Sequence, residues 1–419
     1  MPASPDASAR TPRPVTRTLI AVLALLTAVA PLATDMYLPA FPDMADDLDT
    51  TASGVQLTLT AFLIGLGLGQ LFIGPLSDAV GRRRPLLIGS LVCLGAGVAC
   101  ALAPNVETLA AARFVQGLSG AAGVVLARAI ISDTSRGAAA AKLLGVTMII
   151  SIIAPVVAPL TGGAIIAGAG WRAVFWVLAV LALVMLIGAA ARAKETLPES
   201  ARARGGLGST VSGARQVLAN RHYVGYLLTF CFAFAALFAY ISASPFVMQN
   251  VMGLSAGAYS LVFGLNALAI VATSSAAAAL AGRVTYRGMI AGGLAVSVLA
   301  SAGLLAAVLN GAPMLPTLVL FAVFQGSLGF VFSNATALAL AETDAHAGTG
   351  SAFLGFLQFT LAAAVSPLVG LRGEGTAVPM GLAMLVSTVL AVLAFTVLTR
   401  GKPAARDGAD SGQELSTVV

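Results

Sequence analysis

Long stretches without a charged residue constrain this chain more than any other feature of its sequence. Residues free of Asp, Glu, Lys and Arg form the runs 18–34, 50–77, 85–106, 143–171, 173–191, 222–282, 288–341, 345–371 and 375–399. A helix needs about 20 predominantly apolar residues to cross a membrane. The runs therefore predict a chain that crosses a membrane many times.

Two of these runs are too long for a single crossing. Pro245 and the 253–257 segment divide the run 222–282, and the 310–313 segment divides the run 288–341, because both segments are rich in turn residues. A further apolar segment, about 107–131, carries one charge in its middle, Arg113. The sequence thus predicts an all-α membrane protein with twelve transmembrane helices.

The scarcity of charge excludes several classes of protein. Charged residues make up 10% of the chain and apolar residues 58%, whereas soluble domains have about 25% charged residues. Too few charges remain for the solvated shell of a cytoplasmic globular enzyme, a disordered protein or a nucleic-acid binder. The surplus of basic residues needs another explanation, and their positions supply it.

Lys and Arg concentrate on one side of the predicted topology. With the N-terminus inside, 20 of the 23 basic residues fall in cytoplasmic segments, and Arg128 is counted among them. We therefore expect both termini in the cytoplasm of a bacterium, with the chain in the inner membrane. The predicted division is an N-terminal tail (1–17), a six-helix bundle (18–191), a cytoplasmic linker (192–221), a second six-helix bundle (222–399) and a C-terminal tail (400–419).

The sequence also limits the chemistry. A phosphate-binding P-loop needs Gly-Lys followed by Ser or Thr, but the three lysines precede Leu143, Glu195 and Pro403. The two histidines and three cysteines lack metal-ligand spacing. We expect no enzyme activity, no nucleotide, no metal and no cofactor. A transporter of this kind would take its energy from an ion gradient such as that of protons.

Two charged residues fall inside predicted crossings. Asp35 follows the first apolar run, which we expect to end near Phe41, and Arg113 lies in the antiparallel segment 107–131. At 1.5 Å per residue, both lie about 10 Å below the same membrane surface. One hypothesis is a structural ion pair. The other is a proton site at Asp35 tuned by Arg113, since a nearby cation lowers a carboxyl pKa and desolvation raises it.

Polar residues at helical spacing suggest a substrate path. Tyr240, Asn266 and Gln358 each lie on a stripe of polar or small side chains within an apolar run. Such stripes face the bundle or a cavity rather than lipid, and packing by small side chains explains them as well as ligand contact does. We retain Tyr240, Asn266 and Gln358 as candidate substrate-binding residues.

Several motifs resemble those of one transporter family. The 74–84 segment, GPLSDAVGRRR, is similar to a loop pattern of the major facilitator superfamily, with Gly74, Asp78, Gly81 and Arg82 in the matching positions. The 113–117 segment, RFVQG, and the 158–163 segment, APLTGG, resemble two further motifs, the second with Ala158 in place of glycine. The segments 33–40, 240–247 and 355–359 resemble the Bcr/CflA type of drug:proton antiporters.

The resemblance implies two pseudo-symmetric six-helix bundles and proton-coupled efflux of small amphiphilic drugs like chloramphenicol, florfenicol and bicyclomycin. It implies a coupling proton on Asp35, a binding or electrostatic gating role for Arg113, and docking of the 74–84 loop against the 345–371 segment in the outward-open state. It also implies an antiporter motif at Pro159, Gly162 and Gly163. The residues it implies for substrate binding are Tyr37, Gln116, Met148, Tyr240, Asn266 and Gln358.

Alternatives remain within the same fold. The chain could export an endogenous metabolite or import a nutrient with protons, and the helices do not separate these functions. Where the family sometimes has a second acid in its first helix, this sequence has Thr27, which implies a preference for neutral or weakly polar drugs over dications. We expect a monomer in the lipid bilayer whose partners are the drug and protons, without nucleic acid.

Overall fold

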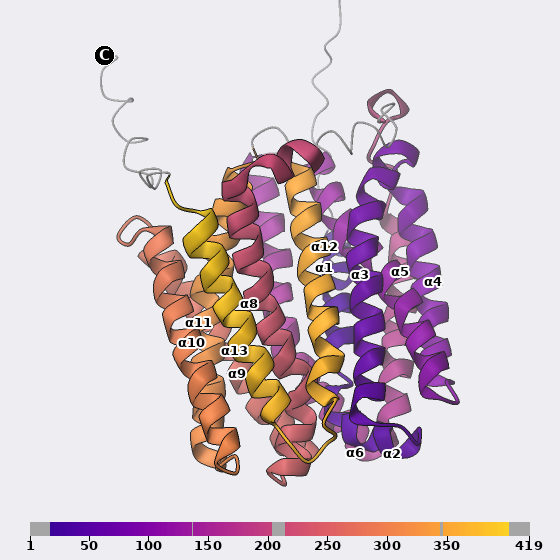
Figure 1. The fold of residues 1–419 in the computed structure, drawn as a ribbon. Coiled ribbons are helices and arrows are strands. Elements are labelled where there is room, and N and C mark those ends of the chain that lie inside the picture. Colours follow the sequence, from indigo (N-terminus) through magenta and orange to yellow (C-terminus); the bar gives the residue numbers. More distant parts are fainter. Residues whose placement is uncertain (1–16, 136, 203–213, 344–346, 402–419) are drawn as a thin grey trace, which may run out of the picture.

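The computed structural model describes residues 17–135, 137–202, 214–343 and 347–401, and these form a bundle of helices that are nearly parallel or antiparallel (Figure 1). The first half contains α1 (Arg17–Asp35), α2 (Phe41–Asp47), α3 (Ala52–Val80), α4 (Arg83–Ala101), α5 (Val106–Thr134) and α6 (Gly137–Arg192). The second half contains α8 (Arg221–Phe246), α9 (Ala256–Leu280), α10 (Tyr286–Leu309), α11 (Met314–Ala341), α12 (Ala347–Val365) and α13 (Val378–Leu393). Short helical segments are η1 (Leu38–Ala40), η2 (Glu199–Ala201), η3 (Val247–Val251), η5 (Ser366–Gly370) and η6 (Ala394–Leu398).

Side-chain caps start several of these helices where the apolar runs begin. Thr51 accepts a hydrogen bond from the Gly54 amide at 3.2 Å, and Asn105 accepts one from the Thr108 amide at 2.9 Å. Ser255 and Thr285 cap α9 and α10 in the same way. Each cap satisfies one of the amides that a helix N-terminus leaves free, so local sequence fixes these boundaries.

The twelve predicted crossings are confirmed. Among the described residues, eleven segments are long and apolar enough to cross a membrane, and one of them, Ile153–Arg192, has 40 residues. Gly170 interrupts α6 with a φ of 73°, a conformation that glycine adopts without steric cost. α6 therefore consists of two antiparallel crossings joined at a tight turn.

Two expected positions fall at helix ends. The first crossing was expected to end near Phe41; α1 ends at Asp35, and the chain continues through η1 and α2 within the apolar segment Ile20–Asp47. Pro39 lies in η1, and its missing amide hydrogen prevents α1 from continuing. Arg128, which was assigned to a cytoplasmic segment, lies in the last third of α5, which continues to Thr134 with Ala127, Ile130 and Ile131 buried.

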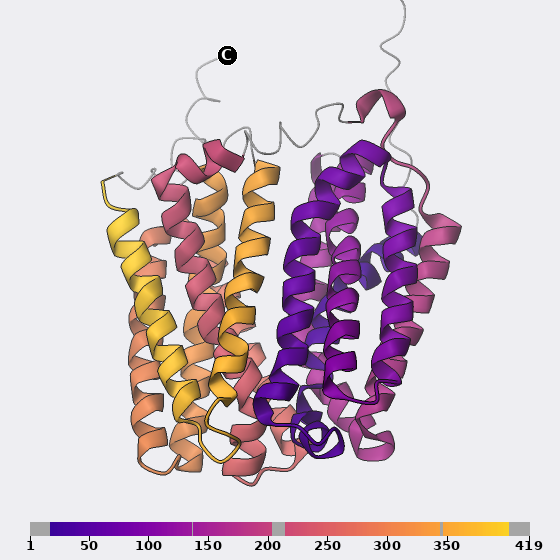
Figure 2. The same cartoon turned by 45° about the vertical axis from the view of Figure 1, so that its right-hand side comes forward.

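The two halves meet mainly at one end of the bundle. We call the end where α1 begins and α13 leads into η6 the terminal side, and the opposite end the distal side; Figure 2 shows the ribbons of the two halves converging at the distal side. There Ser53 donates to the Pro367 carbonyl at 3.3 Å and Gln56 Nε2 to the Ser242 carbonyl at 3.0 Å. Between described residues, no recorded hydrogen bond or ion pair joins the halves at the terminal side, so the molecule is closed distally.

Candidate functional site

Asp35 lies at the C-terminal end of α1, deep in the distal part of the molecule. The residue is 5% exposed, and its Oδ1 atom has no hydrogen-bond donor. The segment that follows it, η1, packs against α6, α8 and α9, so this end of α1 contacts helices of both halves. Gln249 of the second half donates to the Pro39 carbonyl at 3.0 Å. An ionised carboxylate buried without donors is costly, and this makes Asp35 the most unusual acid among the described residues.

Arg113 is fully buried and does not pair with Asp35. Its Nη1 donates to Gln116 Oε1 at 2.6 Å, and its Nη2 donates to the Ala33 carbonyl at 2.9 Å. The guanidinium carbon lies 4.4 Å from the Tyr37 ring centroid and 4.2 Å from that of Phe62. In the described part of the chain no ion pair within 4.0 Å joins Arg113 to an acid. The ion-pair hypothesis is therefore not supported in this conformation.

Tyr37 and Gln116 belong to the surroundings of Arg113. The Tyr37 hydroxyl is 3.3 Å from Thr58 Oγ1, and its ring also packs against Phe175. Gln116 is 2% exposed, and its Oε1 accepts from Arg113. Both side chains are occupied in holding the guanidinium. Their predicted contact with substrate stays a prediction that a different conformation would have to satisfy.

Tyr240 and Asn266 come together in the second half. Asn266 Nδ2 donates to the Tyr240 hydroxyl at 3.1 Å, and the Tyr240 ring packs on Phe263 and Phe321. Gln325 lies 2% exposed in α11 with no partner for its Nε2 atom. Gln325 was not among the predicted residues, although it is a polar residue inside an apolar run.

Gln358 and Met148 are the two remaining candidates for substrate binding. Gln358 lies in α12 and is half-buried. The side chain of Met148 lies outside the described part of the structure. The structure thus joins two of the six predicted substrate residues directly to each other and places two more around Arg113.

The predicted antiporter motif forms a close contact of α6 with its neighbours. A Cβ atom on Gly162 would clash with the carbonyl of Met36, the residue after Asp35. A Cβ on Gly163 would meet the Ser260 hydroxyl oxygen of α9 at 2.5 Å. Pro159 is buried one turn earlier in the same helix. These glycines let α6 pass between the end of α1 and the second half of the molecule.

The 74–84 loop is organised around Arg82. Its guanidinium contacts Asp78 Oδ1 at 2.6 Å and Asp133 Oδ2 at 3.0 Å. Gly81 has a φ of 95°, which requires glycine at the turn, and Gly74 lies near the end of α3. Among the described residues, the recorded polar contacts of this loop all stay within the first half. Its docking against α12 concerned the outward-open state and stays a prediction.

Glu195 completes this loop and was missed in the sequence. Its carboxylate accepts from the amides of Arg82 at 2.8 Å and Arg83 at 3.2 Å. Burial raises the pKa of Glu195, but hydrogen bonds from the Arg82, Leu197, Arg83 and Thr196 amides outweigh this, so its pKa is lowered. Spacing could not reveal the contact, since more than a hundred residues separate the partners.

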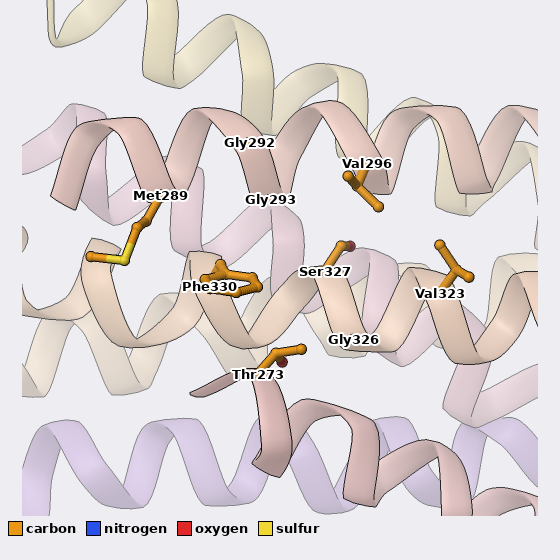
Figure 3. Close-up of a pocket in the computed structure, with 9 residues that line it drawn as sticks. All are labelled: Thr273, Met289, Gly292, Gly293, Val296, Val323, Gly326, Ser327 and Phe330. Atoms are coloured by element: carbon orange, nitrogen blue, oxygen red, sulfur yellow. The ribbon is translucent and has the colours of Figure 1, made fainter. Parts of the chain in front are cut away.

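A cleft on the outside of the second half is unrelated to these residues. It has a volume of about 470 Å³ and lies between α9, α10 and α11 (Figure 3). Its lining is Thr273, Met289, Gly292, Gly293, Val296, Val323, Gly326, Ser327 and Phe330. None of the predicted site residues borders it, so we do not assign it to the candidate site.

The arrangement of twelve crossings in two halves that meet around a buried carboxyl is that of a membrane transporter, not of an enzyme. The sequence profile of the Major Facilitator Superfamily matches residues 23–367. The chain belongs to this superfamily and is a multi-pass membrane protein.

Relatives in other bacteria agree with this assignment. The chain is 40% identical over 381 residues to "Uncharacterized MFS-type transporter YdgK" of Bacillus subtilis (strain 168), covering 90% of this chain and 94% of the relative. It is 32% identical to "Bicyclomycin resistance protein homolog" of Haemophilus influenzae, covering 91% and 96%. A shorter match at 35% identity, covering 61% of this chain and 60% of the relative, is "Chloramphenicol resistance protein" of Pseudomonas aeruginosa.

Solved structures agree on the fold. A D-xylose-proton symporter superposes with a TM-score of 0.71 at 15% identity, covering 92% of this chain and 99% of the symporter. A bacterial homologue of the human lysosomal transporter Spinster, in an inward-facing conformation, superposes with a TM-score of 0.69 at 14% identity, covering 91% and 96%. At these identities the likeness concerns the fold alone.

Proposed function

We propose that this protein exports small amphiphilic drugs of the chloramphenicol, florfenicol and bicyclomycin type in exchange for protons. The observation that carries the proposal is Asp35, a carboxyl that is 5% exposed and has an unpartnered oxygen where the two halves close. The resistance proteins among the relatives support drugs as substrates.

The proposed cycle couples protonation to the closure of the distal side. A proton on Asp35 removes the charge that burial penalises, so the protonated carboxyl favours the distally closed form described above. Loss of the proton favours a form in which the carboxyl is hydrated. Because exchange requires that drug and proton do not cross together, drug binding must favour loss of the Asp35 proton, and by reciprocity protonation must weaken drug binding.

The membrane potential supplies enough energy for one proton per cycle. Moving one charge through 100 mV yields about 2.3 kcal/mol, and about 1.4 kcal/mol corresponds to a tenfold ratio. One proton could therefore sustain a drug gradient of roughly 50-fold per 100 mV. A gradient of this size would be sufficient for resistance.

The direction of export follows from the orientation that we propose. Arg82, Arg83 and Arg84 at the start of α4, and Arg221 at the start of α8, lie at the terminal side. Basic residues favour the cytoplasmic face, so we assign the terminal side and both termini to the cytoplasm. The distally closed form is then the inward-facing form, which receives drug from the cytoplasm.

The test compares Asp35→Asn with wild type and with Asp46→Asn, a matched change at an exposed acid of α2. Chloramphenicol efflux from cells, and antiport in proteoliposomes driven by a pH gradient, should be lost in Asp35→Asn and retained in Asp46→Asn. Undiminished gradient-driven efflux by Asp35→Asn would show that another group carries the proton.

Export of an endogenous metabolite or import of a nutrient is the second candidate function. The similarity in fold to a D-xylose-proton symporter shows that this architecture accommodates import. In proteoliposomes, a symporter would accumulate its substrate on the side to which protons flow, and an antiporter on the opposite side. The same assay would therefore separate these alternatives.

A further inference from the structure

Arg128 is a charged residue inside α5 that the proposed cycle does not use. It lies six residues before the end of the helix at Thr134, which corresponds to about 9 Å along the axis. Its side chain is exposed, and no hydrogen bond or ion pair with a described residue is recorded for it. An arginine within a membrane span is costly, faces the bundle interior or water, and is a functional-site hypothesis by default.

Three sides of α5 are covered by neighbouring helices. The Phe114 carbonyl packs against Gly65 of α3, and Ala122 packs against Gly89 of α4. Gly123 packs against the Leu26 carbonyl of α1. These contacts leave one face of α5, the face between α1 and α3, without a helix of the first half against it.

The uncovered face carries Arg128. Residues three and four apart share a face of a helix, and toward the terminal side this face consists of Gly120, Val124 and Arg128. A Cβ built on Gly120 meets no atom within 4 Å, so open space borders the face. Arg128 is exposed. Because an arginine in a membrane-spanning helix faces the bundle interior or water, we place its side chain toward the open space along this face rather than toward lipid.

A cluster of five phenylalanines, which we call the aromatic wall, lies on the second half. Phe230, Phe234 and Phe238 lie four residues apart on one face of α8, with ring centroids 5.9 Å and 4.9 Å apart. Phe332 of α11 lies 5.1 Å from Phe230, and Phe359 of α12 lies 5.6 Å from Phe234.

The position of the aromatic wall places it toward the first half. Phe359 contacts Gly67 of α3, so the wall reaches the line where the halves meet. Phe234, Phe332 and Phe359 are each only half-buried. The wall therefore borders the space between the halves and is not sealed within the second half.

We propose that Arg128 and the aromatic wall form an entry site on the terminal side that selects aromatic amphiphiles with an anionic or strongly hydrogen-bond-accepting end. The guanidinium donates to that end, and the rings pack against the aromatic body of the ligand. A positive charge repels cations, so the same residue disfavours cationic drugs. The inference rests on the proposed function, since it names the substrate class.

The first test measures binding without any gradient, using the full chain in lipid nanodiscs. The probes are chloramphenicol, whose nitro group accepts hydrogen bonds, and the tetraphenylphosphonium cation. For Arg128→Gln we expect about tenfold weaker chloramphenicol binding, the size expected for loss of a charged hydrogen bond, and tighter tetraphenylphosphonium binding. Arg128→Lys keeps the charge and should still disfavour the cation. Arg283→Gln, at an exposed arginine in the α9–α10 turn, should change neither affinity.

The second test places a cysteine at the site and changes its charge chemically. The native cysteines Cys93, Cys100 and Cys231 are buried, so the wild type is the control. Arg128→Cys should react with a membrane-impermeant thiol reagent from the terminal side, and chloramphenicol should slow the reaction. A cationic methanethiosulfonate should restore the discrimination against tetraphenylphosphonium, and an anionic one should reverse it.

The outcomes separate this inference from the proposed function. Unchanged affinities in Arg128→Gln, or an Arg128→Cys that does not react from the terminal side, would overturn the entry site even if Asp35-dependent antiport is intact. Conversely, wild-type protein that shows the Arg128 effects on binding but no antiport driven by a pH gradient would overturn the proposed function alone.

Discussion

At the scale of single residues, the structure changes the role expected of Arg113. The sequence suggested that it sets the charge state of Asp35, but its guanidinium donates to the Ala33 carbonyl, two residues earlier in α1. A cation at the C-terminal end of a helix interacts favourably with its last carbonyls. Arg113 therefore holds the end of α1 that carries Asp35, and aromatic rings on three sides fix the guanidinium.

Replacing Arg113 with lysine should not preserve function. Lysine keeps the charge but lacks the planar group that reaches both Gln116 and Ala33. We expect a loss of about 2–4 kcal/mol in stability, since a buried hydrogen-bonded network is broken, and a drug-efflux rate at least about tenfold lower. Thermal unfolding in detergent and efflux in cells check this. The control is Arg172→Lys, at a partly exposed arginine that pairs with Asp47, and it should behave like wild type. If Arg113→Lys matched this control in both stability and efflux, the positioning role would be refuted.

At the scale of elements, α6 is the helix that links Asp35, the proposed proton site, to the second half. Gly162 lies against Met36, next to Asp35, and Gly163 lies against Ser260 of α9. A shift in the end of α1 must therefore be accommodated by α6 and passed on to α9. The antiporter motif expected from the sequence does lie beside Asp35, and the physical reason is the close backbone contact that only glycine allows.

A methyl group at Gly162 should disturb this contact. Gly162→Ala places a Cβ against the Met36 carbonyl, and overpacking of this kind costs about 1–3 kcal/mol. Gly168→Ala is the matched control in the same helix, because a Cβ there meets nothing within 4 Å; it should be neutral or stabilising by up to about 1 kcal/mol. Melting temperatures and antiport rates of the two variants measure the difference. Equal values would mean that α6 and α1 are not tightly coupled.

The 74–84 loop shows which contacts the sequence predicts and which it does not. Asp78, Gly81 and Arg82 are neighbours in the chain, so spacing alone predicted that they act together, and Arg82 does contact Asp78. Asp133 and Glu195 bind the same loop from other segments. Only the packing of α3, α4, α5 and α6 brings them there, which no local pattern encodes.

At the scale of the whole molecule, the structure is the distally closed form of the proposed two-state cycle. Side chains of α3 donate hydrogen bonds to backbone carbonyls of the second half at three levels. Ser53 bonds to η5, Gln56 to α8 and Thr60 to α12. Gly370, at the end of η5, lies directly against Gln56 and Ser53. Opening the distal side must break these contacts together, so the two forms are discrete.

A larger residue at Gly370 should shift the molecule toward the distally open form. Gly370→Val forces Gln56 and Ser53 away, and a cost of about 1–3 kcal/mol in the closed form corresponds to a population shift of roughly tenfold or more. The reporter is Thr60→Cys, labelled by an impermeant thiol reagent from the distal side. Gly375→Val is the control in the same connection, where a Cβ meets nothing within 4 Å. Labelling that is equally slow in both backgrounds would contradict a latch at Gly370.

The sequence by itself determined the membrane class, the number of crossings and the turns between them, because the cost of burying charge in lipid and the local chemistry of caps and glycines leave few choices. It also identified Asp35 and Arg113 as exceptional, since charges inside apolar runs need a reason. Only the tertiary structure decided that Arg113 binds a carbonyl instead of Asp35 and that Arg128 lies on an open inner face of α5. Those facts depend on the rotation and crossing of helices distant in sequence, which hydrophobic patterning does not specify.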